Sequence, residues 1–174
     1  MEYIDIDLTK KNNFQAGMLV DISCNNNIVR GWIEKVLSSG NSSDGIKVRL
    51  TNGQEGRVYG IPNPSDLERK NFKFYNLLVN SQELYLIFYR KENRLFTLND
   101  KFLYIFSSKE LAENSIKNTM FENKEFMLRP FGNMTKLFTY LKKQDVKYSM
   151  VIIDKTRQLT KPQLEELYKK FYNC

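Results

Sequence analysis

The sequence contains no histidine and only two cysteines, Cys24 and Cys174, among 174 residues. Without histidine the chain lacks the usual general base, the usual partner of a serine or cysteine nucleophile, and the commonest nitrogen ligand of zinc. Two cysteines do not make a disulfide framework in a chain of this length. We therefore expect Cys24 to be a small strand residue, Cys174 to be a frayed terminal thiol, and no metal or covalent cofactor to be bound.

Long apolar runs and a secretory signal are also missing. The runs at 84–89 and 150–153 have the length of strands, whereas a membrane-spanning helix needs about 20 apolar residues. The first five residues are acidic and lack the basic region and apolar stretch of a signal peptide. We expect no membrane segment and a cytoplasmic location.

Motifs for catalysis are weak. The segment 40–47 is superficially similar to a phosphate-binding loop, but it precedes a predicted strand and has no contiguous Gly-Lys-Ser/Thr at a helix start. The acidic pairs on predicted helices, such as Glu110 with Glu113 and Glu165 with Glu166, have polar surroundings typical of solvated faces. We predict no nucleotide cofactor and no catalytic residue, so an enzyme is the least favoured class.

Charge is distributed unevenly. The formal net charge is +7, which favours an acidic partner. Residues 1–62 contain seven Lys or Arg and seven Asp or Glu, whereas residues 63–174 contain 20 and 13. With 41% hydrophobic residues, 12 Phe and 10 Tyr, the chain can build real cores.

The first part of the chain has the pattern of a small all-β unit. Residues 1–14 show no clear period and are left unassigned. Short β-runs at 18–23, 28–37, 46–51 and 56–61 then alternate with Gly, Asn, Ser and Asp. Within 46–51 the apolar residues alternate strictly with polar ones, so one face is core. Asn52-Gly53 predicts a hairpin, irregular because a three-residue connection or a bulge is needed to pair Val48 with Val58.

Pro62-Asn63-Pro64 marks the expected boundary between a module at 15–62 and one at 63–174. Ser65 to Glu68 and Ser107 to Glu110 have the capping-box form that starts a helix. The expected helices follow at 66–79, after 107–110, at 134–143 and after 160–163, with strands at 84–89, 94–98, 102–106, 126–129 and 148–153. The fold class is therefore α+β, a small barrel followed by a sheet covered by helices.

The segments 17–22 (GMLVDI), 31–37 (GWIEKVL) and 44–58 (DGIKVRLTNGQEGRV) resemble the small bacterial YwbE family over residues 15–61. That unit is similar to KOW-type and SH3-like barrels, which bind RNA or protein in other contexts. Residues 77–171 resemble the SseB N-terminal-type domain through 104–110 (YIFSSKE), Arg129-Pro130-Phe131 and 150–154 (MVIID) before a helix near Pro162. The second resemblance implies a mixed fold of sheet and helices without an established catalytic residue.

The candidate binding residues lie in the first module. Alternation within 28–37 places Arg30 and Trp32 on the non-core face, where an exposed Trp beside an Arg suits stacking on a base or anchoring a protein contact. The alternative is that Trp32 packs against the second module or covers a barrel end. Other cations of this module form either a phosphate-facing patch or the ordinary wet face of a hairpin. The candidate set is Arg30, Trp32, Lys47, Arg49 and Arg57.

The second module has lysines that are either a basic binding surface or merely solubilising. They are Lys136, Lys142, Lys143, Lys147, Lys169 and Lys170. The favoured function is that of a non-enzymatic regulatory or inhibitory protein that binds a protein partner. The alternative is an RNA- or DNA-binding protein that uses the basic and aromatic face of the barrel. The sequence indicates no oligomeric state.

Overall fold

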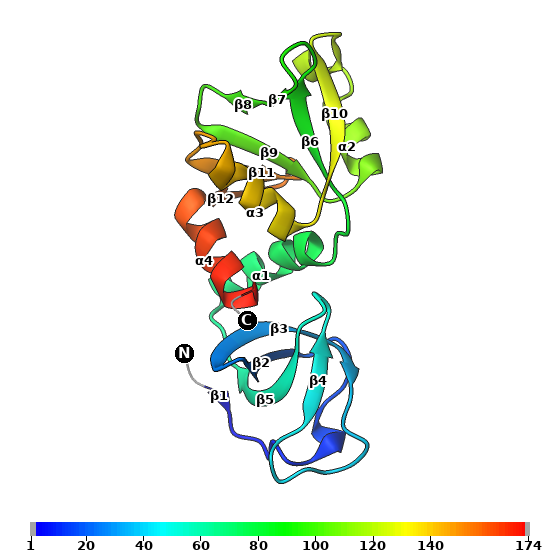
Figure 1. Cartoon of the computed structure of the whole chain (residues 1–174), viewed down its shortest axis with the longest axis vertical. Coiled ribbons are helices and arrows are strands. Elements are labelled where there is room, and N and C mark those ends of the chain that lie inside the picture. The colour runs from blue at the N-terminus through cyan, green and yellow to red at the C-terminus, as the bar shows by residue number, and fades with distance from the viewer. Residues whose placement is uncertain (1–2, 173–174) are drawn as a thin grey trace. The chain divides into compact units, whose positions relative to one another are not determined.

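The computed structural model describes residues 3–172, which form two compact units (Figure 1). Unit 1 comprises residues 3–72 and 165–172, and unit 2 comprises residues 73–164. The division falls within two helices, α1 (Asp66–Val79) and α4 (Lys161–Tyr172). A small β-barrel is followed by a mixed sheet with helices, so the expected α+β class is confirmed. Cys174 lies outside the described residues.

The barrel of unit 1 is built from four antiparallel strands. They are β2 (Leu19–Cys24), β3 (Asn27–Val36), β4 (Lys47–Leu50) and β5 (Glu55–Pro62). The order is β5-β2-β3-β4, and β4 also pairs with β5, which closes the barrel. β1 (Tyr3–Ile4) adds to β5, and the short helix η1 (Lys11–Asn13) leads to Phe14, which is buried in the barrel core. The segment that the sequence left unassigned therefore contributes to the barrel.

The hairpin β4–β5 confirms the alternation and corrects the predicted pairing. Ile46, Val48 and Leu50 are fully buried in the core. Thr51 to Gly53 form a three-residue connection in which Gly53 has a φ of +87°, a conformation that glycine adopts without strain. The predicted pairing of Val48 with Val58 is wrong, because this connection sets Val48 opposite Gly56. Val48, Gly56 and Val58 nevertheless all face the core, because every second residue of each strand points to the same side of the sheet.

Unit 2 contains a mixed sheet with the strand order β10-β6-β9-β11-β12. The strands are β6 (Leu84–Tyr89), β9 (Phe102–Phe106), β10 (Phe126–Gly132), β11 (Met150–Ile153) and β12 (Arg157–Thr160). β9 and β11 are parallel, and the other pairs are antiparallel. The expected strand 94–98 is divided into β7 (Arg94–Leu95) and β8 (Thr97–Leu98), and β12 was not expected.

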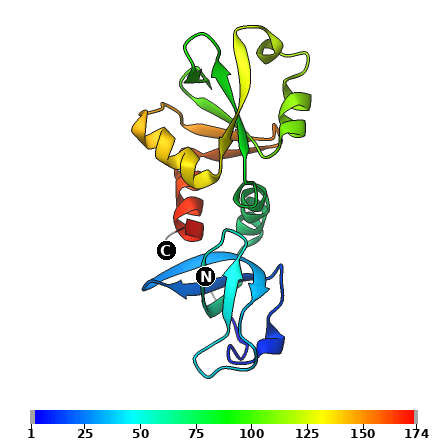
Figure 2. The ribbon, with the colours of Figure 1, turned by 45° about the vertical axis from the view of Figure 1, so that its right-hand side comes forward.

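Helices cover both faces of the strands β6 and β10. Figure 2 shows α2 (Lys109–Ile116) and α3 (Met134–Lys143) on opposite sides of these strands. On the α2 side, Ile87, Phe106 and Phe126 pack with Ala112 and the short helix η2 (Met120–Glu122). On the α3 side, the Phe88 ring lies 6.2 Å from that of Phe131 and 6.4 Å from that of Tyr140.

The two predicted capping boxes have different outcomes. At the start of α1 the Glu68 carboxylate accepts from the Ser65 N–H, and the Glu68 N–H donates back to the Ser65 hydroxyl, so this box is confirmed. At α2 the cap is Ser108, whose hydroxyl accepts from the Leu111 N–H. No helix within residues 3–172 is long and apolar enough to cross a membrane.

Because Ser108 rather than Ser107 caps α2, the Ser107 side chain makes a different contact. Asp154, which follows β11, is only 9% exposed, and its carboxylate accepts from the Ser107 N–H at 2.8 Å and from the Ser107 hydroxyl at 2.7 Å. The carboxylate thus joins the ends of the parallel strands β9 and β11. Two sequence segments 47 residues apart meet at this point.

We expect Asp154→Ala to lower the free energy of unfolding by about 1–3 kcal/mol, because it removes the acceptor of the partly buried Ser107 N–H and hydroxyl. Ser107→Ala should cost less, since the N–H bond to Asp154 remains. Urea denaturation of both variants measures the difference. Equal stability of Asp154→Ala and the unmodified protein would show that water replaces the carboxylate.

Candidate functional site

Arg30, the first of the predicted binding residues, is not on an exposed face. It is 7% exposed, and its guanidinium donates to both carboxylate oxygens of Asp21, at 2.7 Å from Nε and 2.9 Å from Nη2. Asp21 lies directly opposite Arg30 in the β2–β3 ladder and is 3% exposed. The expectation that Arg30 faces solvent is wrong, because this pair and Phe72, whose ring lies 5.5 Å from the guanidinium carbon, cover it.

Trp32 packs against another part of unit 1. Its ring stacks on that of Phe171 in α4, with the ring centres 4.9 Å apart and the planes at 8°. The Asn52 side chain donates to the Phe171 carbonyl at 2.6 Å, and the Phe72 ring meets the Phe171 ring edge-on. Phe171 belongs to the module expected at 63–174, so the observed contact is the alternative in which Trp32 packs against residues of that module, and the indole is half-buried.

Lys47, Arg49 and Arg57 are on the outer surface of the hairpin, as expected, but each has a partner. Glu55 accepts from Arg49 at 2.8 Å and pairs with Lys47 at 3.6 Å. The hydrogen bond from Arg49 holds the pKa of the Glu55 carboxyl below its usual range. Arg57 lies opposite Lys47 in the ladder and donates to the Gly45 carbonyl at 2.7 Å. The predicted set therefore divides into Arg30, which is buried against Asp21, Trp32, which is stacked on Phe171, and three hairpin cations, two of which share the single carboxylate of Glu55.

An exposed apolar and aromatic edge lies elsewhere on the barrel, along β1 and β5. Tyr3, Ile4 and Tyr59, here called the Tyr59 edge, have exposed fractions of 43%, 49% and 54%. The rings of Tyr3 and Tyr59 meet edge-on with their centres 5.8 Å apart. None of these three residues belongs to the set predicted from the sequence.

A β-bulge directs Tyr59 outward. In the β2–β5 ladder Asp21 pairs with Gly60 and Ile22 pairs with Val58, so Tyr59 has no partner on β2. Bulges of this kind redirect a side chain. Gly60 lets the Tyr3 ring approach the strand closely, because a Cβ atom there would lie 2.5 Å from that ring. Gly60, a glycine inside a strand pattern, is the sequence signal from which this bulge could have been predicted.

Tyr3 is fixed through the same buried carboxylate that holds Arg30. Its hydroxyl donates to Asp21 at 2.8 Å. Partial burial, together with that bond to a negatively charged acceptor, raises the pKa of Tyr3 to about 12. Asp21 therefore connects the edge strand β1 to β2 and β3.

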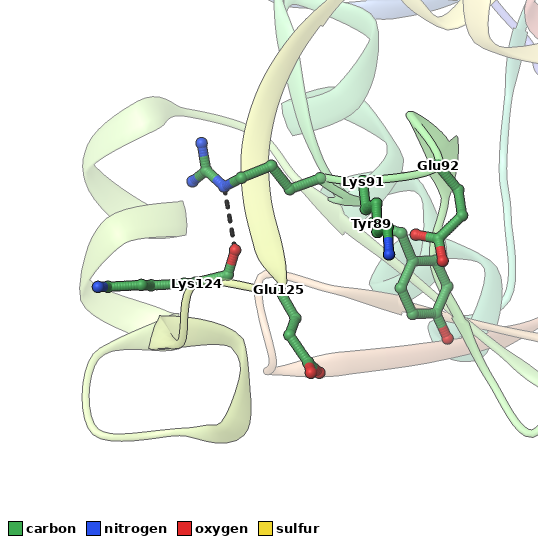
Figure 3. Close-up of a pocket in the computed structure, with 6 residues that line it drawn as sticks. Tyr89, Lys91, Glu92, Lys124 and Glu125 are labelled. Atoms are coloured by element: carbon green, nitrogen blue, oxygen red, sulfur yellow. Dashed lines mark hydrogen bonds between the residues drawn. The ribbon is translucent and has the colours of Figure 1, made fainter.

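The pockets of unit 2 offer a different chemistry. One of about 420 Å³ lies between the turn after β6 and the turn before β10 (Figure 3). Its lining residues are Tyr89, Arg90, Lys91, Glu92, Lys124 and Glu125. The Arg90 guanidinium donates to the Lys124 carbonyl, a bond drawn as the dashed line in Figure 3, and it also donates to the Phe126 carbonyl. The Arg90 side chain is thus bonded to the backbone around the turn before β10. The other charged residues of the pocket are two lysines and two glutamates.

Across residues 3–172 no group of three or more Cys, Asp or Glu side chains is placed to hold a metal ion. The close pair Ser107 and Asp154 is bonded internally, as described above, and forms part of the fold of unit 2. The arrangement that stands out for binding is thus the Tyr59 edge of unit 1.

We expect Asp21→Ala to destabilise the protein by roughly 3–5 kcal/mol, because it leaves the Arg30 charge buried without a counterion. Replacing both partners, as Asp21→Leu with Arg30→Met, should cost less than Asp21→Ala alone. Guanidinium denaturation of the two variants tests this order. A cost below about 1 kcal/mol for Asp21→Ala would instead indicate a pair that behaves as solvent-exposed.

A second prediction concerns alkaline pH. Because the pKa of Tyr3 is about 12 in the folded protein and 10.0 is its ordinary value, the stability that Tyr3 contributes is complete below pH 10 and is lost as the pH rises through 12. The difference in free energy of unfolding between the unmodified protein and Tyr3→Phe should therefore shrink over that window. A difference independent of pH would show that the Tyr3 hydroxyl is not bonded to Asp21.

Comparison with known proteins adds one match. Residues 7–61 match a family described as an uncharacterized conserved protein (DUF2196), and these residues contain most of the barrel of unit 1. No curated protein and no solved structure matches the chain. The small barrel observed at this position is consistent with the match, whereas the YwbE and SseB assignments are not confirmed by it.

Proposed function

We propose that this chain is a non-enzymatic binding protein, regulatory or inhibitory in role, and that unit 1 binds a protein partner through the Tyr59 edge. The YwbE-like nature of residues 15–61 and the SseB-like nature of residues 77–171 are part of the same proposal. The observation that carries it is the exposure of Tyr3, Ile4 and Tyr59 on the paired strands β1 and β5, where the rings of Tyr3 and Tyr59 are in contact.

The chemistry of the Tyr59 edge suits a protein interface. Tyrosine side chains are enriched among the residues that dominate binding energy, since they bury a large ring and keep a polar tip. β1 is at the end of the strand order, and within the described residues it pairs with β5 alone. The other edge of such a strand can accept an extended peptide by main-chain hydrogen bonds.

The charge of unit 1 favours a protein over a polyanion. Counted over the sequence 1–72 and 165–174, unit 1 holds eleven of the 27 Lys and Arg residues and eleven of the 20 Asp and Glu residues. Its hairpin cations Lys47 and Arg49 share Glu55. A neutral surface gives little of the counterion release that drives nucleic-acid binding.

The absence of histidine supports a non-enzymatic role, since acid–base catalysis near neutral pH most often uses that side chain. The barrel residues first considered for binding are also engaged with one another or with the backbone. Side chains held in this way stabilise the barrel and have few donors left for a substrate.

The alternative, RNA or DNA binding by the barrel, keeps one supporting observation. Lys47 and Arg57 are directly opposite each other and both exposed, so two cations are adjacent on one strand face. Phosphate oxygens could lie between them. Arg30 has no part in this version, because it is buried against Asp21.

Affinity capture with matched variants separates the two functions. Tyr59→Ser should release the partner without unfolding the protein, because Tyr59 is 54% exposed, whereas Leu67→Ser, at a position 61% exposed elsewhere in unit 1, should retain it. Nuclease should leave capture unchanged. Loss of capture with nuclease, or with Lys47→Gln and Arg57→Gln but not with Tyr59→Ser, would favour the nucleic-acid alternative.

A further inference from the structure

A second surface, in unit 2, combines aromatic rings with cations. A groove of about 370 Å³ lies beside α3 and the end of β10. This volume falls within the range of roughly 300–1,000 Å³ for small-molecule pockets. Its lining residues, here called the Phe131 groove, are Phe131, Thr135, Lys136, Thr139, Tyr140 and Lys143. The set contains two lysines, two threonines and two aromatic residues, and no carboxylate.

A bulge places the first ring. In the β6–β10 ladder Pro130 pairs with Tyr85 and Gly132 pairs with Leu84, so Phe131 is the unpaired residue. Its ring meets that of Tyr140 edge-on with the ring centres 4.9 Å apart. Both rings are half-buried, so each keeps part of its surface open to solvent. The rings of Phe131 and Tyr140 are thus held in place by packing against each other.

The backbone also positions Lys136. Gly132 has a φ of +93°, and a Cβ atom there would lie 2.8 Å from the Lys136 side-chain Cδ. The aliphatic stem of Lys136 therefore lies over this glycine. Thr135 and Lys143 follow on the exposed face of α3, and the Thr139 hydroxyl donates to the Thr135 carbonyl at 2.9 Å while its oxygen can still accept.

Charge in unit 2 has one sign in excess. Unit 2 holds 16 of the 27 Lys and Arg residues and nine of the 20 Asp and Glu residues, so it carries the whole net charge of +7. Among residues 3–172 neither Lys136 nor Lys143 has a carboxylate within ion-pair distance, whereas Lys147 is paired with Asp145 at 3.0 Å. The two groove lysines are therefore available to an anionic ligand.

A neighbouring groove on the other side of Tyr140 is less suited to an anion. It has a volume of about 310 Å³ and includes Arg94 and Lys147, but also Asp100 and Asp145. The two carboxylates there would repel phosphate. Of these two neighbouring grooves, the Phe131 groove is therefore the better complement to a polyanion.

We propose that the Phe131 groove binds single-stranded nucleic acid. Exposed bases stack on aromatic rings regardless of sequence, while nearby cations contact the phosphates. Lys136 and Lys143 take the phosphates, Phe131 and Tyr140 present ring surface to one base, and the Thr135 hydroxyl donates to a phosphate or sugar oxygen. An acidic peptide would satisfy the lysines but would leave the exposed ring surface without a planar partner, so nucleic acid fits the groove better.

Fluorescence anisotropy with labelled oligo(U) and oligo(dT) of about ten nucleotides tests this proposal on the full chain. Lys136→Gln with Lys143→Gln should weaken binding roughly tenfold at low salt and reduce the salt slope by about 1.4. Phe131→Leu, which keeps an apolar side chain but removes the ring, should weaken binding roughly tenfold with little change in that slope.

Lys117→Gln with Lys124→Gln is the matched control, because it removes the same charge from exposed positions of unit 2 outside the groove. It should keep the affinity within about twofold at moderate salt. Circular dichroism checks that each variant is folded. The proposal is overturned if the control weakens binding as much as the groove variant, if neither oligonucleotide binds at low salt, or if polyglutamate binds as tightly as oligo(U).

Discussion

Each unit of this protein depends on one buried carboxylate. Asp21 and Asp154 are the buried acidic side chains of the described residues, and both are bonded to groups distant in the sequence. A carboxylate is costly to bury unless its oxygens accept hydrogen bonds, so the folded structure must place hydrogen-bond donors beside each of the two. Asp21 brings Arg30 and Tyr3 together on the barrel, and Asp154 brings Ser107 to the end of β11. The positions of β1 and of the parallel strands follow from these bonds.

Irregularities in the strands place the two aromatic surfaces. In a regular strand, alternation assigns each side chain to one face or the other, whereas a bulge changes that assignment locally. Tyr59 and Phe131 are both unpaired at bulges, and both are accessible. Each has a glycine directly after it, Gly60 and Gly132, over which the side chain of another residue lies closely. A bulge followed by a glycine thus contributes both to the Tyr59 edge, which suits a protein partner, and to the Phe131 groove, which suits a polyanion.

The division of charge makes two different partners physically reasonable. Unit 1 is neutral and presents an apolar edge, whereas unit 2 carries the entire net charge of +7 and has a groove without carboxylates. Long-range attraction of a polyanion would be directed to unit 2. A protein partner held through the Tyr59 edge would gain mainly from burial of apolar surface, which depends little on salt.

The sequence by itself determined the α+β class, the strand faces of the hairpin and the cap at Ser65, because these depend on side chains within a few residues of one another. The absence of histidine likewise limited the chemistry before any fold was known. Only the tertiary structure decided that Arg30 is buried and that Trp32 stacks on Phe171, 139 positions later in the chain. It also decided which rings are accessible. The physical reason is that alternation assigns a residue to a face, whereas what covers that face depends on register, bulges and packing between distant segments.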